Sequence, residues 1–354
     1  EVVLNVLPLN LLDTNKTGRA WMIPLLRDNV RFARLGFFSE QFIPLIEQFG
    51  KRLEVLDESS VHYKIFQTII DQCWSLIPHF ADLPSDLQKA FTDEFAQQLS
   101  QLLYSTPELR VNICHALRLL VQSNVAYAGG ALAEDKLLSQ EFDFKTAESN
   151  VEYLSSKAAN VLAVLFNVFS QTNPDSRGFV LETIDAYLSI SKPADLEKTF
   201  NQVSVLLKNA FDEEAKKEKS NTKQPKGQAK LSVTMMDLVV AMAKYVPESS
   251  YNALFTIFTQ TISSTDPLLQ KRSYRIITKL VETPSGNQAL TSFATEIENA
   301  LVQATETVHL SSRASRLLAI QTVLSILPQD HLHFIPTILS EIILCTKDAN
   351  EKTR

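Results

Sequence analysis

The sequence is poor in glycine and cysteine and has no long apolar run. It contains 8 glycines in 354 residues, which is few for a fold with many strand-to-strand turns. Its 3 cysteines lie far apart in apolar stretches. They match neither a disulfide framework nor a zinc motif, so we expect buried thiols in a reducing compartment. The densest apolar stretch, residues 161–169, is shorter than the roughly 18 residues that a membrane span needs.

The sequence also lacks an excess of basic residues. Its formal net charge is −6, and its isoelectric point is about 5.6. Nucleic-acid binding would therefore require a local basic patch, because the whole molecule does not attract polyanions. Hydrophobic residues make up 45% of the chain, which is enough to bury a large core and excludes global disorder.

Apolar residues recur at spacings of three and four in most windows, and strict alternation of strand length is nearly absent. This periodicity is typical of amphipathic helices that each bury one face. The sequence therefore predicts an all-α fold.

A short pattern, a turn followed by a helix with an early basic residue, recurs at intervals of about 40 residues. It is clearest in "TDPLLQKRSYRIITKLV" from Thr265, where Asp266 can cap the helix and Pro267 suits its first turn. This recurrence predicts an α-solenoid of about six to eight antiparallel helix pairs of the HEAT or armadillo type. The early basic residues of the clearest copies are Arg110, Arg177, Arg272, Arg313 and Arg316.

Two insertions interrupt the repeats, at about residues 123–149 and 212–230. The second is highly charged and of low complexity, so we expect a mobile loop there. We otherwise expect one continuous array over residues 1–354. Both termini fall within repeat-like sequence, which indicates a fragment of a longer protein.

The segments "LPLNLLD" from Leu7 and "GRAWMIPLLRDNVRFARLGFFSEQFIPL" from Gly18 resemble the signature of the ribosomal RNA-processing protein 12 family. These proteins are large HEAT-repeat factors of eukaryotic ribosome assembly. The signature lies within residues 1–50, and the remaining residues resemble the family only as a HEAT array.

The resemblance implies a non-enzymatic scaffold without a cofactor in ribosome biogenesis. Its partners would be pre-ribosomal particles, mainly the small-subunit precursor, with their rRNA and assembly factors. The resemblance also implies a role in nuclear export, a nucleolar and nuclear location, and association with Ran GTPase and nuclear-pore proteins. It implies no membrane and no small-molecule substrate. A karyopherin-like transport receptor, or another HEAT-repeat adaptor, would have the same architecture and remains an alternative.

The signature segment contains the first candidate docking residues. We expect a short helix over residues 20–26 and a second helix over about 29–49, bent near Pro44. That second helix would place Arg27, Arg31 and Arg34 on one face, with an aromatic stripe including Phe38 on another. The arginines would then either dock phosphates or acidic proteins, or form a solvated face with nearby carboxylates. The full candidate set is Arg19, Arg27, Arg31, Arg34, Lys51 and Arg52.

The charged insertion contains a second, weaker set of candidates. Its lysines alternate with acidic residues, so they either sample RNA phosphates or serve to keep the insertion soluble. These candidates are Lys216, Lys217, Lys219, Lys223 and Lys226.

No pattern in the sequence indicates catalysis. Cys114 and His115 are neighbours, and adjacent residues on a helix do not face each other as nucleophile and base. His331 and His333 would lie on different faces of a helix, which argues against a metal site. The phosphate-binding and metalloprotease motifs are absent from the sequence. We therefore expect a binding protein and not an enzyme.

Overall fold

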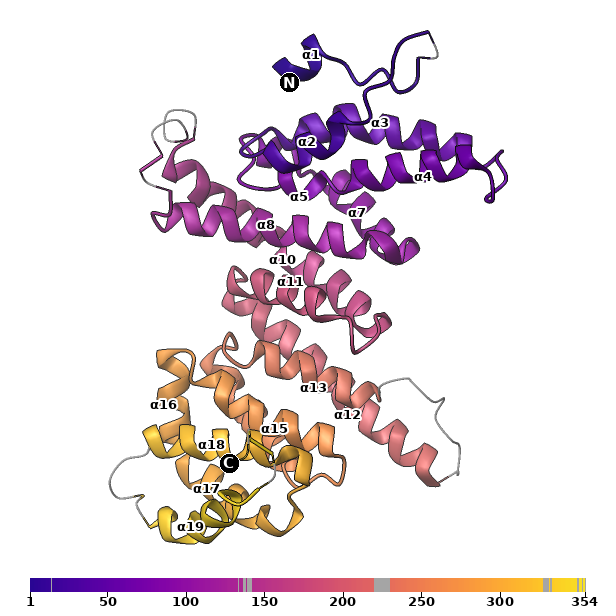
Figure 1. The fold of residues 1–354 in the computed structure, drawn as a ribbon. Coiled ribbons are helices and arrows are strands. Elements are labelled where there is room, and N and C mark those ends of the chain that lie inside the picture. The colour runs from indigo at the N-terminus through magenta and orange to yellow at the C-terminus, as the bar shows by residue number, and fades with distance from the viewer. Residues whose placement is uncertain are drawn as a thin grey trace. The chain divides into compact units, whose positions relative to one another are not determined.

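The computed structural model describes residues 1–13, 15–132, 134–135, 138, 142–219, 230–326, 331, 333–348, 350–351 and 353. These residues form helices joined by turns and loops, and none of them lies in a strand (Figure 1). The predicted all-α class is confirmed. The chain divides into two compact units, Glu1–Ile190 (unit 1) and Ser191–Arg354 (unit 2).

Unit 1 consists of helices that pack in pairs. α3 packs along α4, and α8 packs against α5, α10 and α11 (Figure 1). The helices of this unit are α1 (Val2–Val6), α2 (Met22–Asn29), α3 (Leu35–Leu53), α4 (Val61–Trp74), α5 (Ile77–Phe80), α6 (Leu87–Ala90), α7 (Asp93–Ser105), the 3-10 turn η1 (Pro107–Leu109), α8 (Arg110–Ala128), α10 (Phe144–Gln171) and α11 (Gly178–Ser189).

Unit 2 repeats the same kind of packing. α13, α15 and α18 form a row in which each contacts the next, and α12 and α14 pack against members of that row. This pairing fits the α-solenoid class predicted from the repeats. Its helices are α12 (Pro193–Lys219), α13 (Leu231–Met242), η2 (Glu248–Ser250), α14 (Tyr251–Thr261), α15 (Pro267–Leu280), α16 (Pro284–Ser292), α17 (Ala294–Gln303), η3 (Thr305–Thr307), η4 (Leu310–Ser312), α18 (Arg313–Ile326) and α19 (Phe334–Cys345).

An aromatic cluster forms the core of unit 1 where α3, α4 and α5 meet. The ring of Phe38 lies 5.7 Å from Phe42, 6.0 Å from Trp74 and 5.8 Å from Phe80, measured between centroids. Phe38 and Phe42 are completely buried, as expected for the predicted stripe. Aromatic pairs at these separations add stability beyond the area that they bury.

The turn before α15 forms as its sequence predicts. The Asp266 carboxylate accepts a hydrogen bond from the Leu268 N–H at 2.9 Å, and Pro267 occupies the first turn of the helix. The same arrangement begins α16, where the Thr283 hydroxyl accepts from the Gly286 N–H at 3.2 Å. Local capping thus defines where these helices start.

The prediction of one helix over residues 29–49 is wrong. α2 ends at Asn29 and α3 begins at Leu35. The cause is a distant cap: the Asp86 carboxylate accepts from the N–H groups of Leu35 at 2.7 Å and Gly36 at 3.0 Å. Between the helices, Phe32 has a left-handed backbone with φ of 56°, which ends helical geometry.

The loop predicted over 212–230 is partly wrong, because α12 continues to Lys219. Alanine, glutamate and lysine favour helix, and Glu214 anchors this extension. Its two carboxylate oxygens accept from the N–H of Ser232 at 3.1 Å and from the Ser232 hydroxyl at 2.7 Å. Of the other expected insertion, residues 123–128 belong to α8 and residues 144–149 belong to α10.

Candidate docking surfaces

The predicted arginines do not share a helix face. Arg27 lies in the last turn of α2, Arg31 lies between the helices, and Arg34 is the N-cap residue of α3. Arg27 pairs with Asp28 at 3.0 Å. Arg34 forms ion pairs with Glu1 and, at 3.5 Å, with Glu40.

The other candidates of the first set differ in their surroundings. Arg19 donates to the Pro8 carbonyl at 2.7 Å and so holds the N-terminal loop. Arg52 lies 5.6 Å from the centre of the Phe49 ring, and its Nη2 is 3.5 Å from the Leu12 carbonyl oxygen. Lys51 is exposed in the last turn of α3, where a cation is favoured by the helix dipole.

The lysine candidates are only partly described. Lys216 and Lys217 are exposed on α12, and Lys219 is the last residue of that helix. Lys223 and Lys226 lie outside the described residues.

The fold brings together a group that the sequence does not reveal. Arg27 and Arg31 lie close enough to His79 of α5 to lower its pKa, although burial has the larger effect. Burial also lowers the pKa of His115 on α8, helped by the charge of Arg118. Burial raises the pKa of Asp82 despite the charges of Arg31 and both histidines. We call Arg27, Arg31, His79, Asp82 and His115 the histidine cluster.

The histidine cluster contains groups that can bind an anion, beside the Asp82 carboxylate and the Asp28 partner of Arg27. Guanidinium groups suit phosphate oxygens, and each imidazole can donate a hydrogen bond. Arg31 and His115 are exposed at this edge of unit 1, while His79 and Asp82 are half-buried. Two members, Arg27 and Arg31, belong to the set predicted from the sequence. The two histidines were not predicted, because 35 other residues separate them in the sequence and only the packing of α5 on α8 brings them together.

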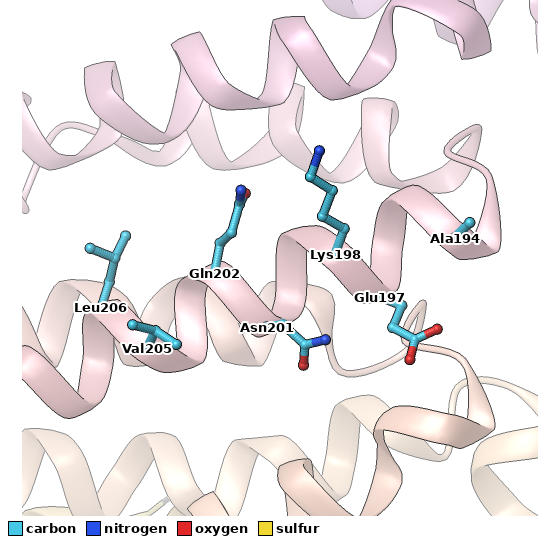
Figure 2. Close-up of a pocket in the computed structure, with 7 residues that line it drawn as sticks. All are labelled: Ala194, Glu197, Lys198, Asn201, Gln202, Val205 and Leu206. Atoms are coloured by element: carbon cyan, nitrogen blue, oxygen red, sulfur yellow. The ribbon is translucent and has the colours of Figure 1, made fainter.

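A second surface lies along α12, where a hollow of about 800 Å³ is lined by residues of that helix alone. Figure 2 shows two rows of side chains, with Lys198, Gln202 and Leu206 in one row. Val205 and Leu206 are 59% and 50% exposed. This face offers both apolar and polar groups to a partner.

Most of the early arginines of the repeats are structural. Arg110 donates to the Leu103 carbonyl at 2.8 Å, in the last turn of α7. Arg177 lies 3.4 Å from the Phe169 carbonyl oxygen, in the last turn of α10. Each contact places a cation at the carbonyl groups of a last helical turn, which is the negative end of the helix dipole. The Phe169 carbonyl also accepts from the N–H of Thr172, the C-cap of α10, at 3.4 Å. Arg110 and Arg177 therefore connect the start of one helix to the end of the helix before it, and they are not candidates for docking a partner.

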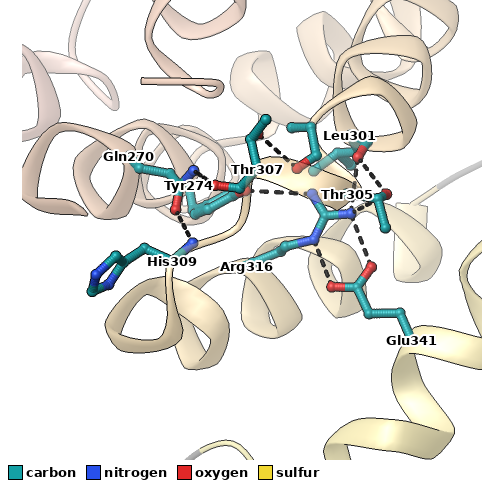
Figure 3. Close-up of polar contacts among 9 residues, drawn as sticks. Gln270, Tyr274, Leu301, Thr305, Thr307, His309, Arg316 and Glu341 are labelled. Atoms are coloured by element: carbon teal, nitrogen blue, oxygen red, sulfur yellow. Dashed lines mark hydrogen bonds and ion pairs between the residues drawn. The ribbon is translucent and has the colours of Figure 1, made fainter. Parts of the chain in front are cut away.

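Arg316 is the most extensively bonded of these arginines. It is fully buried, donates to the Leu301 carbonyl at 2.8 Å in the last turn of α17, and pairs with both carboxylate oxygens of Glu341 at 2.7 and 2.9 Å. Figure 3 shows it between Tyr274, Thr305 and Glu341. Arg272 makes a similar bidentate pair with Asp237, at 2.6 and 2.9 Å.

The cysteines have the buried positions that the sequence predicts. Burial raises the pKa of the Cys73 and Cys114 thiols to about 12. At neutral pH they are therefore protonated, and a protonated thiol is a poor nucleophile.

The predicted separation of His331 and His333 is wrong. Neither residue lies within an α-helix, since His331 is in a 3-10 turn and His333 is the N-cap residue of α19, so the 3.6-residue period does not apply. Their rings approach the same carboxylate, that of Glu298, at 2.9 Å and 3.7 Å. Across the described part of the chain, no three histidine, cysteine or acidic side chains are grouped so that they could hold a metal ion.

None of the described helices combines sufficient length with sufficient apolar character to cross a membrane.

Comparison with known proteins places the chain in a family. Residues 1–172 match the family model described as "Ribosomal RNA-processing protein 12, HEAT repeats". The whole chain is 48% identical to "Ribosomal RNA-processing protein 12" of Saccharomyces cerevisiae and 33% identical to "Putative ribosomal RNA-processing protein 12" of Schizosaccharomyces pombe. The whole chain is also 28% identical to the "RRP12-like protein" of Homo sapiens.

The chain spans 29%, 30% and 25% of the lengths of these three relatives. The similarity extends over both units and includes the signature segment with its Gly-Arg-Ala-Trp sequence. Together with the paired helices of both units, these matches show that the chain belongs to the ribosomal RNA-processing protein 12 family.

Proposed function

We propose that the chain is part of a non-enzymatic scaffold in ribosome biogenesis that binds pre-ribosomal particles. The observation that carries this proposal is the 48% identity, over the entire chain, to a yeast protein named for ribosomal RNA processing. Helical repeats add support, because stacked helix pairs present long surfaces to macromolecular partners. The partners in this proposal are rRNA and assembly factors, mainly of the small-subunit precursor.

The histidine cluster is the proposed contact for rRNA. Arg27 and Arg31 are exposed cations close to the imidazole of His79, whereas most other candidate arginines hold parts of the fold together. A phosphate backbone attracts such local groups even when the net charge of the protein is negative. Lys51 is a further exposed cation of unit 1.

The proposal includes a nucleolar and nuclear location and a role in export. Its support is the resemblance of residues 7–45 to a family of ribosome-assembly factors. Association with Ran GTPase and nuclear-pore proteins belongs to the same proposal and rests on the same resemblance.

The scaffold proposal is tested by a chimera in yeast. The matching segment of the Saccharomyces cerevisiae relative is replaced by this chain, and pre-rRNA processing is followed by pulse labelling. We expect processing and sedimentation with pre-ribosomal particles to be retained. A chimera that is stably produced but accumulates unprocessed pre-rRNA, or stays free of particles, would contradict the proposal.

The role of the cluster is tested separately by Arg27→Glu with Arg31→Glu. We expect weaker crosslinking of the chain to RNA and an unchanged thermal midpoint, because both side chains are exposed. The matched control is Lys208→Glu with Lys271→Glu, which changes the net charge equally at exposed positions of unit 2. Equal losses in both double variants would remove the cluster from the proposal.

A further inference from the structure

Unit 1 contains a groove of about 1060 Å³ that lies apart from the surfaces described above. It runs between the α3–α4 pair on one side and α7, η1 and the start of α8 on the other. All of these elements belong to unit 1. The groove is larger than most small-molecule pockets, which are about 300–1,000 Å³.

The floor of the groove is apolar. Trp74, Phe95 and Leu99 line it with parts of side chains that are otherwise buried in the core. Ile46 and Ile70 are half-buried and extend the apolar surface along α3 and α4. Apolar side chains of a partner would be removed from water here, at about 25 cal/mol for each Å² buried.

The rim of the groove is acidic. Glu47 of α3, Asp71 of α4 and Glu108 of η1 line it and are exposed. No lysine or arginine is among the lining residues. Within the described part of the chain, the Glu47 and Glu108 carboxylates have no hydrogen-bond or ion-pair partner, and the Asp71 carboxylate accepts one hydrogen bond, from Gln67 at 2.9 Å.

The nearby arginines do not neutralise this rim by direct contact. Arg110 follows Glu108 closely in the sequence, but its guanidinium is buried and donates to the Leu103 carbonyl and the Thr172 hydroxyl. Arg52, at the end of α3, packs over the Phe49 ring. Among the described residues, therefore, none of the three carboxylates that face solvent around the apolar floor forms an ion pair.

We propose that this groove binds a segment of another protein in which lysine or arginine side chains flank apolar anchors. An apolar centre with a polar rim is the usual organisation of a protein interface, and the acidic rim selects a basic partner. The same rim repels phosphates, so the geometry disfavours RNA. The inference goes beyond the scaffold function by naming a partner chemistry and its position, and it does not depend on the histidine cluster.

The experiment uses the tryptophan in the floor as a local probe. The chain has 2 tryptophans, and Trp21 is 60% exposed, so Trp21→Phe leaves Trp74 as the reporter. A short amphipathic peptide of leucine and lysine is titrated into this 354-residue variant. We expect a saturable shift of Trp74 emission, with affinity that falls as salt is raised. The matched peptide with glutamate in place of lysine should produce no shift.

Neutralising the rim tests the charge complementarity. Glu47→Gln, Asp71→Asn and Glu108→Gln together should weaken binding of the lysine peptide by about tenfold or more. The control triple variant, Glu148→Gln, Glu152→Gln and Asp175→Asn, makes the same change of charge at exposed positions outside the groove and should bind normally. Circular dichroism and the thermal midpoint verify that both variants fold.

A second variant examines the floor independently of the rim. Ile70→Lys places a cation among the lining residues and should also abolish the Trp74 response to the lysine peptide. The proposal is overturned if both triple variants lose affinity equally, or if the glutamate peptide binds as well as the lysine peptide. It is equally overturned if an RNA oligonucleotide produces the Trp74 shift in place of the peptide. A concentration-dependent dimer that the rim variant abolishes would assign the groove to a second copy of the chain.

Discussion

Arg316 shows how much of the fold can depend on one side chain. It is fully buried in unit 2, and its guanidinium donates to Glu341, to the Leu301 carbonyl and to the Thr305 hydroxyl, the last at 2.9 Å. A buried ion pair of this kind adds little net stability relative to an apolar replacement of both partners. Removal of one partner is costly, because the other charge stays buried without compensation.

We therefore predict that Arg316→Ala lowers the free energy of unfolding of unit 2 by about 3–5 kcal/mol. Urea unfolding followed by circular dichroism measures this loss. Arg313→Ala is the control, because Arg313 is 39% exposed and pairs with Asp348 at 3.1 Å. A surface pair contributes about 0–1 kcal/mol, so the control should unfold almost like the wild type. Similar losses in both variants would contradict the structural role of Arg316.

We expect two histidines to make the stability of unit 1 dependent on pH. Burial lowers the pKa of half-buried His79 and, together with the charge of Arg118, that of the more exposed His115 in the folded chain, so both bind protons more readily when the chain is unfolded. The folded state therefore has its full stability above the ordinary histidine pKa of about 6.5 and loses stability as the pH falls below it. The raised pKa of Asp82 has the opposite effect, because the folded chain binds this proton more readily than the unfolded chain. Its contribution to stability therefore grows as the pH falls towards the ordinary aspartate pKa of about 3.9.

We expect the thermal midpoint to fall between about pH 7.5 and about pH 5.5, and to fall less in the double variant His79→Gln with His115→Gln. Differential scanning calorimetry at several pH values measures both profiles. His62→Gln is the control, because it removes an exposed imidazole of α4 outside the histidine cluster. A double variant as pH-sensitive as the wild type would show that these imidazoles do not govern the acid response.

At the scale of the element, the start of α3 depends on a residue far away in the sequence. Its N-cap, Arg34, makes no capping hydrogen bond with its side chain. The Asp86 carboxylate serves instead, at 2.7 Å from the Leu35 nitrogen and 3.0 Å from the Gly36 nitrogen. A Cβ atom at Gly36 would lie 2.8 Å from the Asp86 Oδ2, so glycine allows this close approach.

Asp86→Ala should destabilise unit 1 by about 0.5–2 kcal/mol, the usual range for loss of a helix cap. Hydrogen exchange followed by mass spectrometry should show that Asp86→Ala speeds exchange, relative to the wild type, more at the first turn of α3 than at its last turn. Asp86→Asn keeps one carbonyl oxygen as acceptor and should lose less. If Asp86→Ala exchanged at the wild-type rate in that turn, the cap would have no energetic role.

The contrast between α15 and α3 explains which parts of the fold the sequence predicts. Asp266 and Pro267 lie beside the helix that they start, so local capping rules locate the start of α15. The break before α3 depends on Asp86, which is 51 residues from Leu35, and apolar periodicity continues across the break. Element type was therefore predictable, whereas a boundary imposed by tertiary contact was not.

The same distinction applies to the candidate sites. The sequence indicated that Arg27 and Arg31 were available cations, and it marked Arg110 and Arg316 as recurring features of the repeats. It could not show that Arg110 and Arg316 are buried, because burial depends on which helix end lies opposite. The groove was also beyond prediction, since its acidic rim combines residues of α3, α4 and η1.

At the scale of the whole molecule, stacked helix pairs are stabilised mainly by contacts between neighbours. The chain forms two compact units, and each has its own core. Phe38 belongs to the aromatic cluster of unit 1, and Arg316 belongs to the buried network of unit 2. The two residues share no contact partner among the described residues, so their energetic effects should be independent.

We predict that Phe38→Ala, at a cost of about 3–5 kcal/mol, speeds amide exchange in α3 and α4 and leaves α15 and α18 at wild-type rates. Arg316→Ala should produce the reverse pattern, because opening of a repeat stack is governed by its nearest interfaces. In the double variant the two free-energy losses should add within about 0.5 kcal/mol. Hydrogen exchange of the four proteins, resolved by peptide, measures each unit separately. If either single variant accelerated exchange throughout both units, the chain would unfold as one cooperative body, and stability would not be local to each part of the stack.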